Sequence, residues 1–248
     1  MGRMLGLVAG MLAATSTASA QIVFEALNLD KGLLRTLAGQ DRAFSAVVSL
    51  RASGAEGPVE SLEMRLIVRA GQMRAEVDVD HVNIRHFGAD EIEMMKRAGL
   101  GQVTEIARLE KGFSYVILPL AKAYCEVRPE EIGRSAHPKW RVLEKKATGQ
   151  EEVDKHPCAV NAVALESEGE DKVKLTVTTW EARDLKDFPI KIVVRDGKEE
   201  RAIIQFKDVD LTPPDEWLFE PPTGWRRYPG IEQMMEERMR LMGGMFGD

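Results

Sequence analysis

The residues whose types and spacing could bind a metal ion lie together in the segment 78–86, which reads DVDHVNIRH. This segment has carboxylates at Asp78 and Asp80 and imidazoles at His81 and His86, and both groups are ligands of zinc. The spacing matches no standard metal site, and along a strand Asp78 and Asp80 share one face while His81 points away. We therefore interpret these side chains as solvated polar groups at a strand end, and we predict neither a metal site nor a cofactor.

The short motifs of common catalytic and nucleotide-binding sites do not occur in the sequence. It contains no G-x-S-x-G, no H-E-x-x-H, no phosphate-binding glycine loop and no dinucleotide fingerprint. Acidic pairs such as Glu151-Glu152 and Glu199-Glu200 have the character of turns and solvated edges. We therefore predict a protein that is not an enzyme and has no catalytic residue.

The first 20 residues have the composition of a secretory signal peptide. Arg3 supplies a positive charge, residues 4–14 form an apolar segment too short to span a bilayer, and Ala18-Ser19-Ala20 has the pattern of a cleavage site. The alternative interpretation is that these residues form a buried N-terminal helix of the folded protein. No cysteine follows the expected cleavage site, and no later segment is long and apolar enough to cross a membrane. We therefore predict export to the periplasm as a protein that does not span the membrane.

Two cysteines, Cys125 and Cys158, are present in the chain. In an oxidising compartment an even pair of cysteines predicts a disulfide, and the alternative is two buried thiols that behave as small apolar groups. His156 lies two residues before Cys158, which in a strand puts both on one face without making a catalytic dyad. A disulfide is therefore the preferred expectation over a reactive thiol.

The formal net charge of the chain is −6, and this charge indicates which kinds of partner the protein can bind electrostatically. Proteins that bind nucleic acids or anionic lipid surfaces through their charge are usually basic. We therefore expect no nucleic-acid partner.

Alternating apolar and polar residues predict β-strands in both halves of the chain. Between Lys172 and Trp180, for example, valine and leucine alternate with lysine and threonine, which is the pattern of a half-buried strand. Further strands are expected at 43–52, 61–69, 73–79, 103–109, 113–118, 123–127, 140–147, 190–194 and 202–209. Their connections are too short for crossover helices, so we predict two antiparallel meanders that join into one curved sheet.

Three helices are expected to cover this sheet. The first covers residues 31–38 and carries Leu33, Leu34 and Leu37, and the second covers 90–98 and carries Met94 and Met95. The third covers 231–242 and has a methionine-rich stripe, which either folds back onto the sheet or binds a partner.

The C-terminal half contains a series of motifs that resembles a known family. The motifs read G-x-E-x-V-x-x-H-P-C, a strand that ends in tryptophan, F-P-I-K-I, and W-L-F-E-P-P-x-G-W. The positions that carry the resemblance are Gly149, Glu151, Val153, His156, Pro157, Cys158, Trp180, Phe188, Pro189, Phe219, Pro221 and Gly224. The chain thus resembles the LolA/LolB-like, lipoprotein-carrier-like superfamily of bacterial envelope proteins, and within it an uncharacterised periplasmic branch.

This resemblance implies a mainly β fold with helical covers, in which a curved antiparallel sheet forms a half-open barrel. Residues 21–229 would form a single domain of this kind, and residues 230–248 a methionine-rich C-terminal helix and tail. The resemblance also implies that the helix near the N-terminus covers the concave side. Its motifs are structural, so they predict the fold and not a chemistry.

Two functions are compatible with these patterns. The first is a carrier or binding protein for a lipid or acyl chain, with Leu33, Leu34, Leu37, Met94 and Met95 as the ligand-binding residues. The second is an envelope interaction or sensor module with a packed core, which binds a protein partner through its edge strands or the C-terminal helix. Whether the barrel is hollow or packed distinguishes them.

Overall fold

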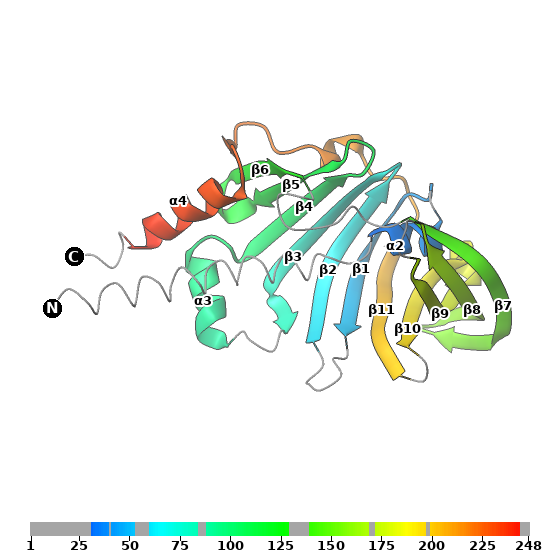
Figure 1. Cartoon of the computed structure of the whole chain (residues 1–248). Coiled ribbons are helices and arrows are strands. Elements are labelled where there is room, and N and C mark those ends of the chain that lie inside the picture. Colours follow the sequence, from blue (N-terminus) through cyan, green and yellow to red (C-terminus); the bar gives the residue numbers. More distant parts are fainter. Residues whose placement is uncertain are drawn as a thin grey trace.

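A single β-sheet of twelve strands forms the framework of the protein. The computed structural model describes residues 31–39, 41–52, 60–83, 88–128, 139–168, 172–196 and 199–243. Along the sheet the strand order is β12-β6-β5-β4-β3-β2-β1-β11-β10-β9-β8-β7. The sheet curves from β6 at one end to β7 at the other, with α2 over the β7 end and α4 beside β6 (Figure 1).

The described strands are β1 (Phe44–Ala52), β2 (Glu60–Arg69), β3 (Gln72–Asn83), β4 (Gln102–Arg108), β5 (Phe113–Leu118), β6 (Ala123–Val127), β7 (Trp140–Val153), β8 (His156–Ser167), β9 (Lys174–Ala182), β10 (Phe188–Asp196), β11 (Glu199–Asp210) and β12 (Arg226–Tyr228). The described helices are α2 (Lys31–Ala38), α3 (Ala89–Arg97) and α4 (Ile231–Gly243), with short 3₁₀ turns at η1 (Pro119–Ala121), η3 (Arg183–Leu185) and η4 (Glu216–Phe219).

The pairing of β1 with β11 joins the two meanders, and we call it the central seam. It is antiparallel and extends from Ser45 opposite Asp210 to Ala52 opposite Ala202. Three phenylalanines pack beside it, since the ring of Phe188 lies 4.9 Å from Phe44 and 5.3 Å from Phe206 in edge-to-face contacts. Because β1 and β11 are far apart in sequence, the seam makes one sheet from two local units.

One face of the sheet, the inner face, carries the main core and all three described helices. Alternate residues of the strands, such as Val48 and Met64, point into this core together with Leu34 of α2, Met95 of α3 and Met234 of α4. The period-two pattern of the strands therefore meets the apolar stripes of the helices on one side.

The opposite face, the outer face, has a second and smaller core. Ile67, Ile106 and Ile117 point outward from β2, β4 and β5, and Phe219 lies on them with no exposed surface. Phe219 belongs to residues 211–225, which cross this face between β11 and β12 and which we call the strap. The strap is rich in proline and tryptophan, and it buries apolar side chains on the face of the sheet opposite the described α-helices.

Three arginines of adjacent strands hold the backbone of the strap. Arg69 of β2 donates a hydrogen bond to the carbonyl of Pro214, Arg74 of β3 to that of Leu218 at 2.9 Å, and Arg108 of β4 to that of Phe219 at 3.4 Å. Arg108 is buried and also forms ion pairs with Glu110 and Glu220. These bonds satisfy carbonyl groups that no regular secondary structure pairs.

The two edges of the sheet differ. The edge strand β7 pairs only with β8, its pairing is interrupted by two register shifts, and residues 141–152 are exposed on both sides. At the other edge the three residues of β12 pair with β6 in parallel. Both bulged and very short strands are poor templates for further pairing.

The fold confirms the predicted mainly β architecture with helical covers. Every segment expected to be a strand or one of the three helices is one, with bounds that differ by a few residues. The sheet is open and is not closed into a barrel, and one pair, β12 with β6, is parallel where only antiparallel pairs were expected. The predicted signal peptide, residues 1–20, lies outside the described residues.

The predicted disulfide between Cys125 and Cys158 is not formed. Neither cysteine is in a disulfide bond, and both are buried, Cys125 in β6 and Cys158 in β8, with eight strands between β6 and β8 in the sheet. Neighbouring strands lie about 4.8 Å apart, whereas a disulfide requires Cα atoms within about 7 Å. The expectation rested on the number of cysteines and on the compartment, neither of which contains information on distance.

The buried arginine of the strap makes a testable contribution to stability. We expect Arg108→Met to lower the free energy of unfolding by about 2 kcal/mol, because the carbonyl of Phe219 loses its charged donor. Urea denaturation would measure it. The matched control is Arg97→Met, which breaks an exposed ion pair with Glu93 and should change stability by less than about 0.5 kcal/mol. Equal effects of the two variants would contradict the role given to Arg108.

Candidate functional site

The residues predicted to bind an acyl ligand lie on the inner face, and the structure separates them into two groups. Leu33 and Leu34 of α2 are buried, Leu37 is partly buried, and the helix packs against β7 and β10. On α3, which packs against β3, Met95 is buried while Met94 is 43% exposed. Four of the five predicted residues therefore contact the same core, and Met94 faces outward.

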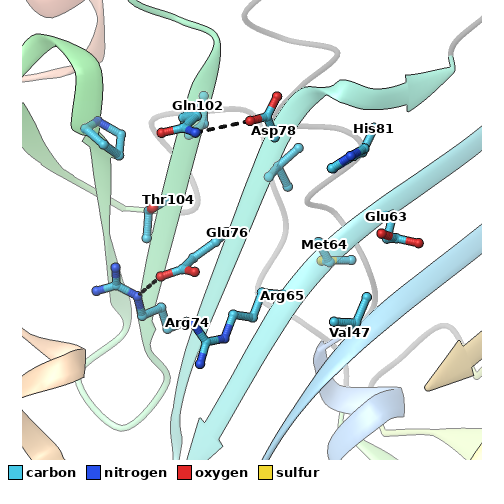
Figure 2. A pocket seen from close by; sticks show the side chains of 13 residues that line it. Val47, Glu63, Met64, Arg65, Arg74, Glu76, Asp78, His81, Gln102 and Thr104 are labelled. Carbon is cyan, nitrogen blue, oxygen red and sulfur yellow. Dashed lines mark hydrogen bonds and ion pairs between the residues drawn. The ribbon is translucent and has the colours of Figure 1, made fainter. Parts of the chain in front are cut away.

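A groove of about 460 Å³ lies on the outer face over strands β1 to β4. Its floor and walls come mainly from outward-facing side chains, which Figure 2 shows rising from neighbouring strands. The lining residues are Val47, Glu63, Met64, Arg65, Arg74, Glu76, Val77, Asp78, His81, Gln102, Val103, Thr104 and Pro119. The strap covers the adjoining part of the same face and leaves the groove open.

Basic side chains gather at the end of the groove nearest the strap (Figure 2). Arg74 forms a 2.7 Å ion pair with Glu76 and also holds the carbonyl of Leu218. Arg65 lies directly opposite Glu76 in the pairing of β2 with β3, and its side chain is exposed. Arg74 is thus fixed by the fold, whereas Arg65 can reach into the groove.

Acidic side chains define the other end. A carboxylate oxygen of Asp78 accepts a hydrogen bond from Gln102 at 3.1 Å, and the other accepts one from the backbone of Asp80 at 3.0 Å. Partial burial raises the pKa of Asp78, but these two hydrogen bonds, together with His81 and Lys96 nearby, outweigh burial and hold the pKa below its ordinary value. Asp78 is therefore ionised at neutral pH.

The residues first considered as metal ligands have other contacts. Asp78 is bonded to Gln102, and Asp80 forms an ion pair with Lys96 at 2.5 Å. His86 lies outside the described residues. Within the described ranges, no three side chains of histidine, cysteine, aspartate or glutamate converge as a metal site would require.

The histidine beside Cys158 has an acidic partner that the sequence analysis did not identify. Nδ1 of His156 lies 2.7 Å from a carboxylate oxygen of Asp184, 28 residues further along the chain. The Cys158 thiol donates instead to the backbone carbonyl of His156 at 3.3 Å, and burial raises its pKa. A buried, protonated thiol is a poor nucleophile, so this arrangement is a structural contact.

The groove itself was missed by the sequence analysis, although a signal for it exists. Charged residues occupy alternate positions on two consecutive strands, Glu63 and Arg65 on β2 and Arg74, Glu76 and Asp78 on β3. By alternation alone, such charges read as the solvated side of half-buried strands. Which of these charges become neighbours depends on the register of β2 and β3, which the alternation alone does not give.

Comparisons with known proteins are limited to similarities of structure. No protein-family model and no curated protein matches the sequence. A LolA superfamily protein from Nitrosomonas europaea matches over 75% of this chain and 93% of its own, at 12% identity and a TM-score of 0.39. LprF from Mycobacterium bovis matches over 81% and 97%, at 12% identity and a TM-score of 0.42.

An uncharacterised conserved protein from Thermus thermophilus matches over 86% of this chain and 99% of its own, at 14% identity and a TM-score of 0.41. One of these three structural neighbours is a LolA superfamily protein. At these identities the similarity concerns the arrangement of strands and helices and not a function. In the part of the chain that the structure describes, none of the helices has the length and apolar character needed to cross a membrane.

The state of the two cysteines can be measured directly. We expect neither thiol of the native protein to react with a thiol reagent within minutes, because Cys125 and Cys158 are 0% and 2% exposed. After unfolding without a reductant, two thiols per chain should react. If no thiol appears until a reductant is added, the cysteines are bonded and the strand order given above is wrong.

Proposed function

We propose that this chain is an exported envelope protein that binds a lipid or acyl chain on its inner face and acts as a binding protein or carrier without catalysis. The observation that carries the proposal is the construction of the inner face. A continuous sheet supplies one apolar surface, and separate short helices, α2, α3 and α4, cover it. A covering helix can move away without breaking hydrogen bonds to its neighbours, because each helix satisfies its own backbone hydrogen bonds. A strand of a covering sheet could not.

In the proposed mechanism, the ligand displaces a helix that covers the inner face. If α2 moves away from β7 and β10, the apolar surface under Leu33 and Leu34 is exposed while the strand pairing stays intact. An acyl chain that takes the place of these side chains restores the buried apolar area, so the exchange costs little net free energy. Leu33, Leu34, Leu37 and Met95, with Met94 at the margin, are the proposed contacts.

The alternative is a module that binds a protein partner through α4. Met234 of this helix has no exposed surface, and Ile231 and Met235 pack against the main core. The helix is further attached through Arg238, which donates to the carbonyl of Ala98 at 3.1 Å. These contacts support a role of α4 as a cover of the sheet rather than as a free docking helix.

Native mass spectrometry of the mature protein, purified from its own envelope fraction, tests the proposal. We expect a stoichiometric acyl-bearing lipid, identified after extraction, and saturable binding of a fluorescent fatty acid to protein stripped of lipid. A clean mass without ligand, together with no binding of the fatty acid, would contradict the proposal and would favour the protein-partner alternative.

Substitutions in α2 test where the ligand lies. We expect Leu37→Asp to weaken fatty-acid binding about tenfold or more, because a charge replaces part of the apolar contact. Leu34→Asp should weaken it further if the variant folds. The matched control is Leu120→Asp, at a side chain that is 58% exposed in η1, which should bind like the unmodified protein. If α2 variants that are folded by circular dichroism bind normally, the ligand does not lie under this helix.

A further inference from the structure

We propose that the groove on the outer face is a second binding site, which takes a small zwitterion with its phosphate or carboxylate on Arg65 and its primary ammonium on Glu63 and Asp78. This site lies on the face of the sheet opposite the helices, so it is independent of acyl binding on the inner face. Its volume of about 460 Å³ is within the range of small-molecule sites.

Two charged side chains of opposite sign line this groove without being used by the fold. Neither Arg65 nor Glu63 forms an ion pair or a hydrogen bond through its side chain with any residue that the structure describes. Both lie on β2, two residues apart, and both point to the outer face (Figure 2). Charges held in a groove without partners are available to a ligand.

The neighbouring charges, in contrast, are held in place. Glu76 is bound by Arg74, which is itself anchored on the strap through the carbonyl of Leu218. Asp78 is oriented by Gln102 and by the backbone of Asp80. An ionised carboxylate accepts up to about four hydrogen bonds, so Asp78 keeps capacity for an ammonium group. The groove is therefore preorganised on paired strands, which lowers the cost of binding.

The order of the charges along the strands defines the class of ligand. Arg65 and Arg74 lie toward the strap, and Glu63, Asp78 and His81 lie toward the other end of the groove (Figure 2). Residues two apart on a strand are about 7 Å apart, so Arg65 and Glu63 suit a molecule whose opposite charges are separated by a few ångströms. Arginine binds phosphate or carboxylate through paired hydrogen bonds, and carboxylates bind an ammonium through its N–H groups.

Calorimetric titration of the full-length protein with phosphoethanolamine tests this proposal. We expect saturable binding that is at least about tenfold tighter than that of inorganic phosphate or ethanolamine alone, since each of these carries only one of the two charges. Phosphocholine should also bind more weakly, because its quaternary ammonium has no N–H donor. If phosphoethanolamine does not bind, or binds no better than inorganic phosphate, the proposal is wrong.

Two substitutions that each remove one charge test whether the ligand lies in the groove. Arg65→Gln and Glu63→Gln each remove one charge that the fold does not use, and each should weaken binding about tenfold or more with an unchanged melting temperature. The matched control is Arg51→Gln, at an exposed arginine of β1 outside the groove, which should bind normally. Normal binding by both groove variants would overturn the proposal.

An experiment with lipid vesicles distinguishes a free zwitterion from a lipid headgroup as the ligand. Phosphatidylethanolamine vesicles, compared with phosphatidylcholine vesicles in a flotation assay, present the same ammonium and phosphate on a membrane. If phosphoethanolamine binds, additional binding to these vesicles that requires Arg65 and Glu63 supports a lipid headgroup as the ligand, and no binding to the vesicles supports a soluble one. If the unmodified protein does not bind phosphoethanolamine, the proposed site is wrong, and the acyl-binding test on the inner face is unaffected.

Discussion

The central seam is the contact on which the rest of the structure depends. Without the pairing of β1 with β11, the chain would consist of two meanders, each with an apolar face too narrow to bury three helices. The three phenylalanines, Phe44, Phe188 and Phe206, add side-chain packing to the backbone hydrogen bonds at this position. Because the seam extends the inner face across both halves, one core serves the whole domain.

An open sheet has two faces, and this chain covers them by different means. The inner face is covered by amphipathic helices that bury apolar side chains against it. The outer face is closed only in part, by a strap whose backbone is held by arginines, and its open part is polar. An apolar ligand therefore suits one face and a charged ligand the other, and the sheet between them separates the two environments.

Local patterns of the sequence predicted the elements well and the distant contacts poorly. The alternation between Lys172 and Trp180 and the apolar stripe with Leu33 and Leu34 identified a strand and a helix, because both depend on neighbours in sequence. Within each half the strands follow one another in chain order, as the two expected meanders require. The parallel pairing of β12 with β6 and the hydrogen bond of Arg108 with Phe219 join residues more than a hundred positions apart, and no local period encodes them. The groove was missed for the same reason, and the disulfide was wrongly expected.

The exposed edge strand β7 has a consequence for the behaviour of the protein at high concentration. A straight strand of 14 residues would be a template on which further molecules could add strand by strand into fibres. The register shifts between Val142 and Glu144 and between Ala147 and Gly149 divide it into short pieces that offer no continuous row of hydrogen-bonding groups. The interrupted pairing therefore makes this long edge strand a poor template for fibre growth.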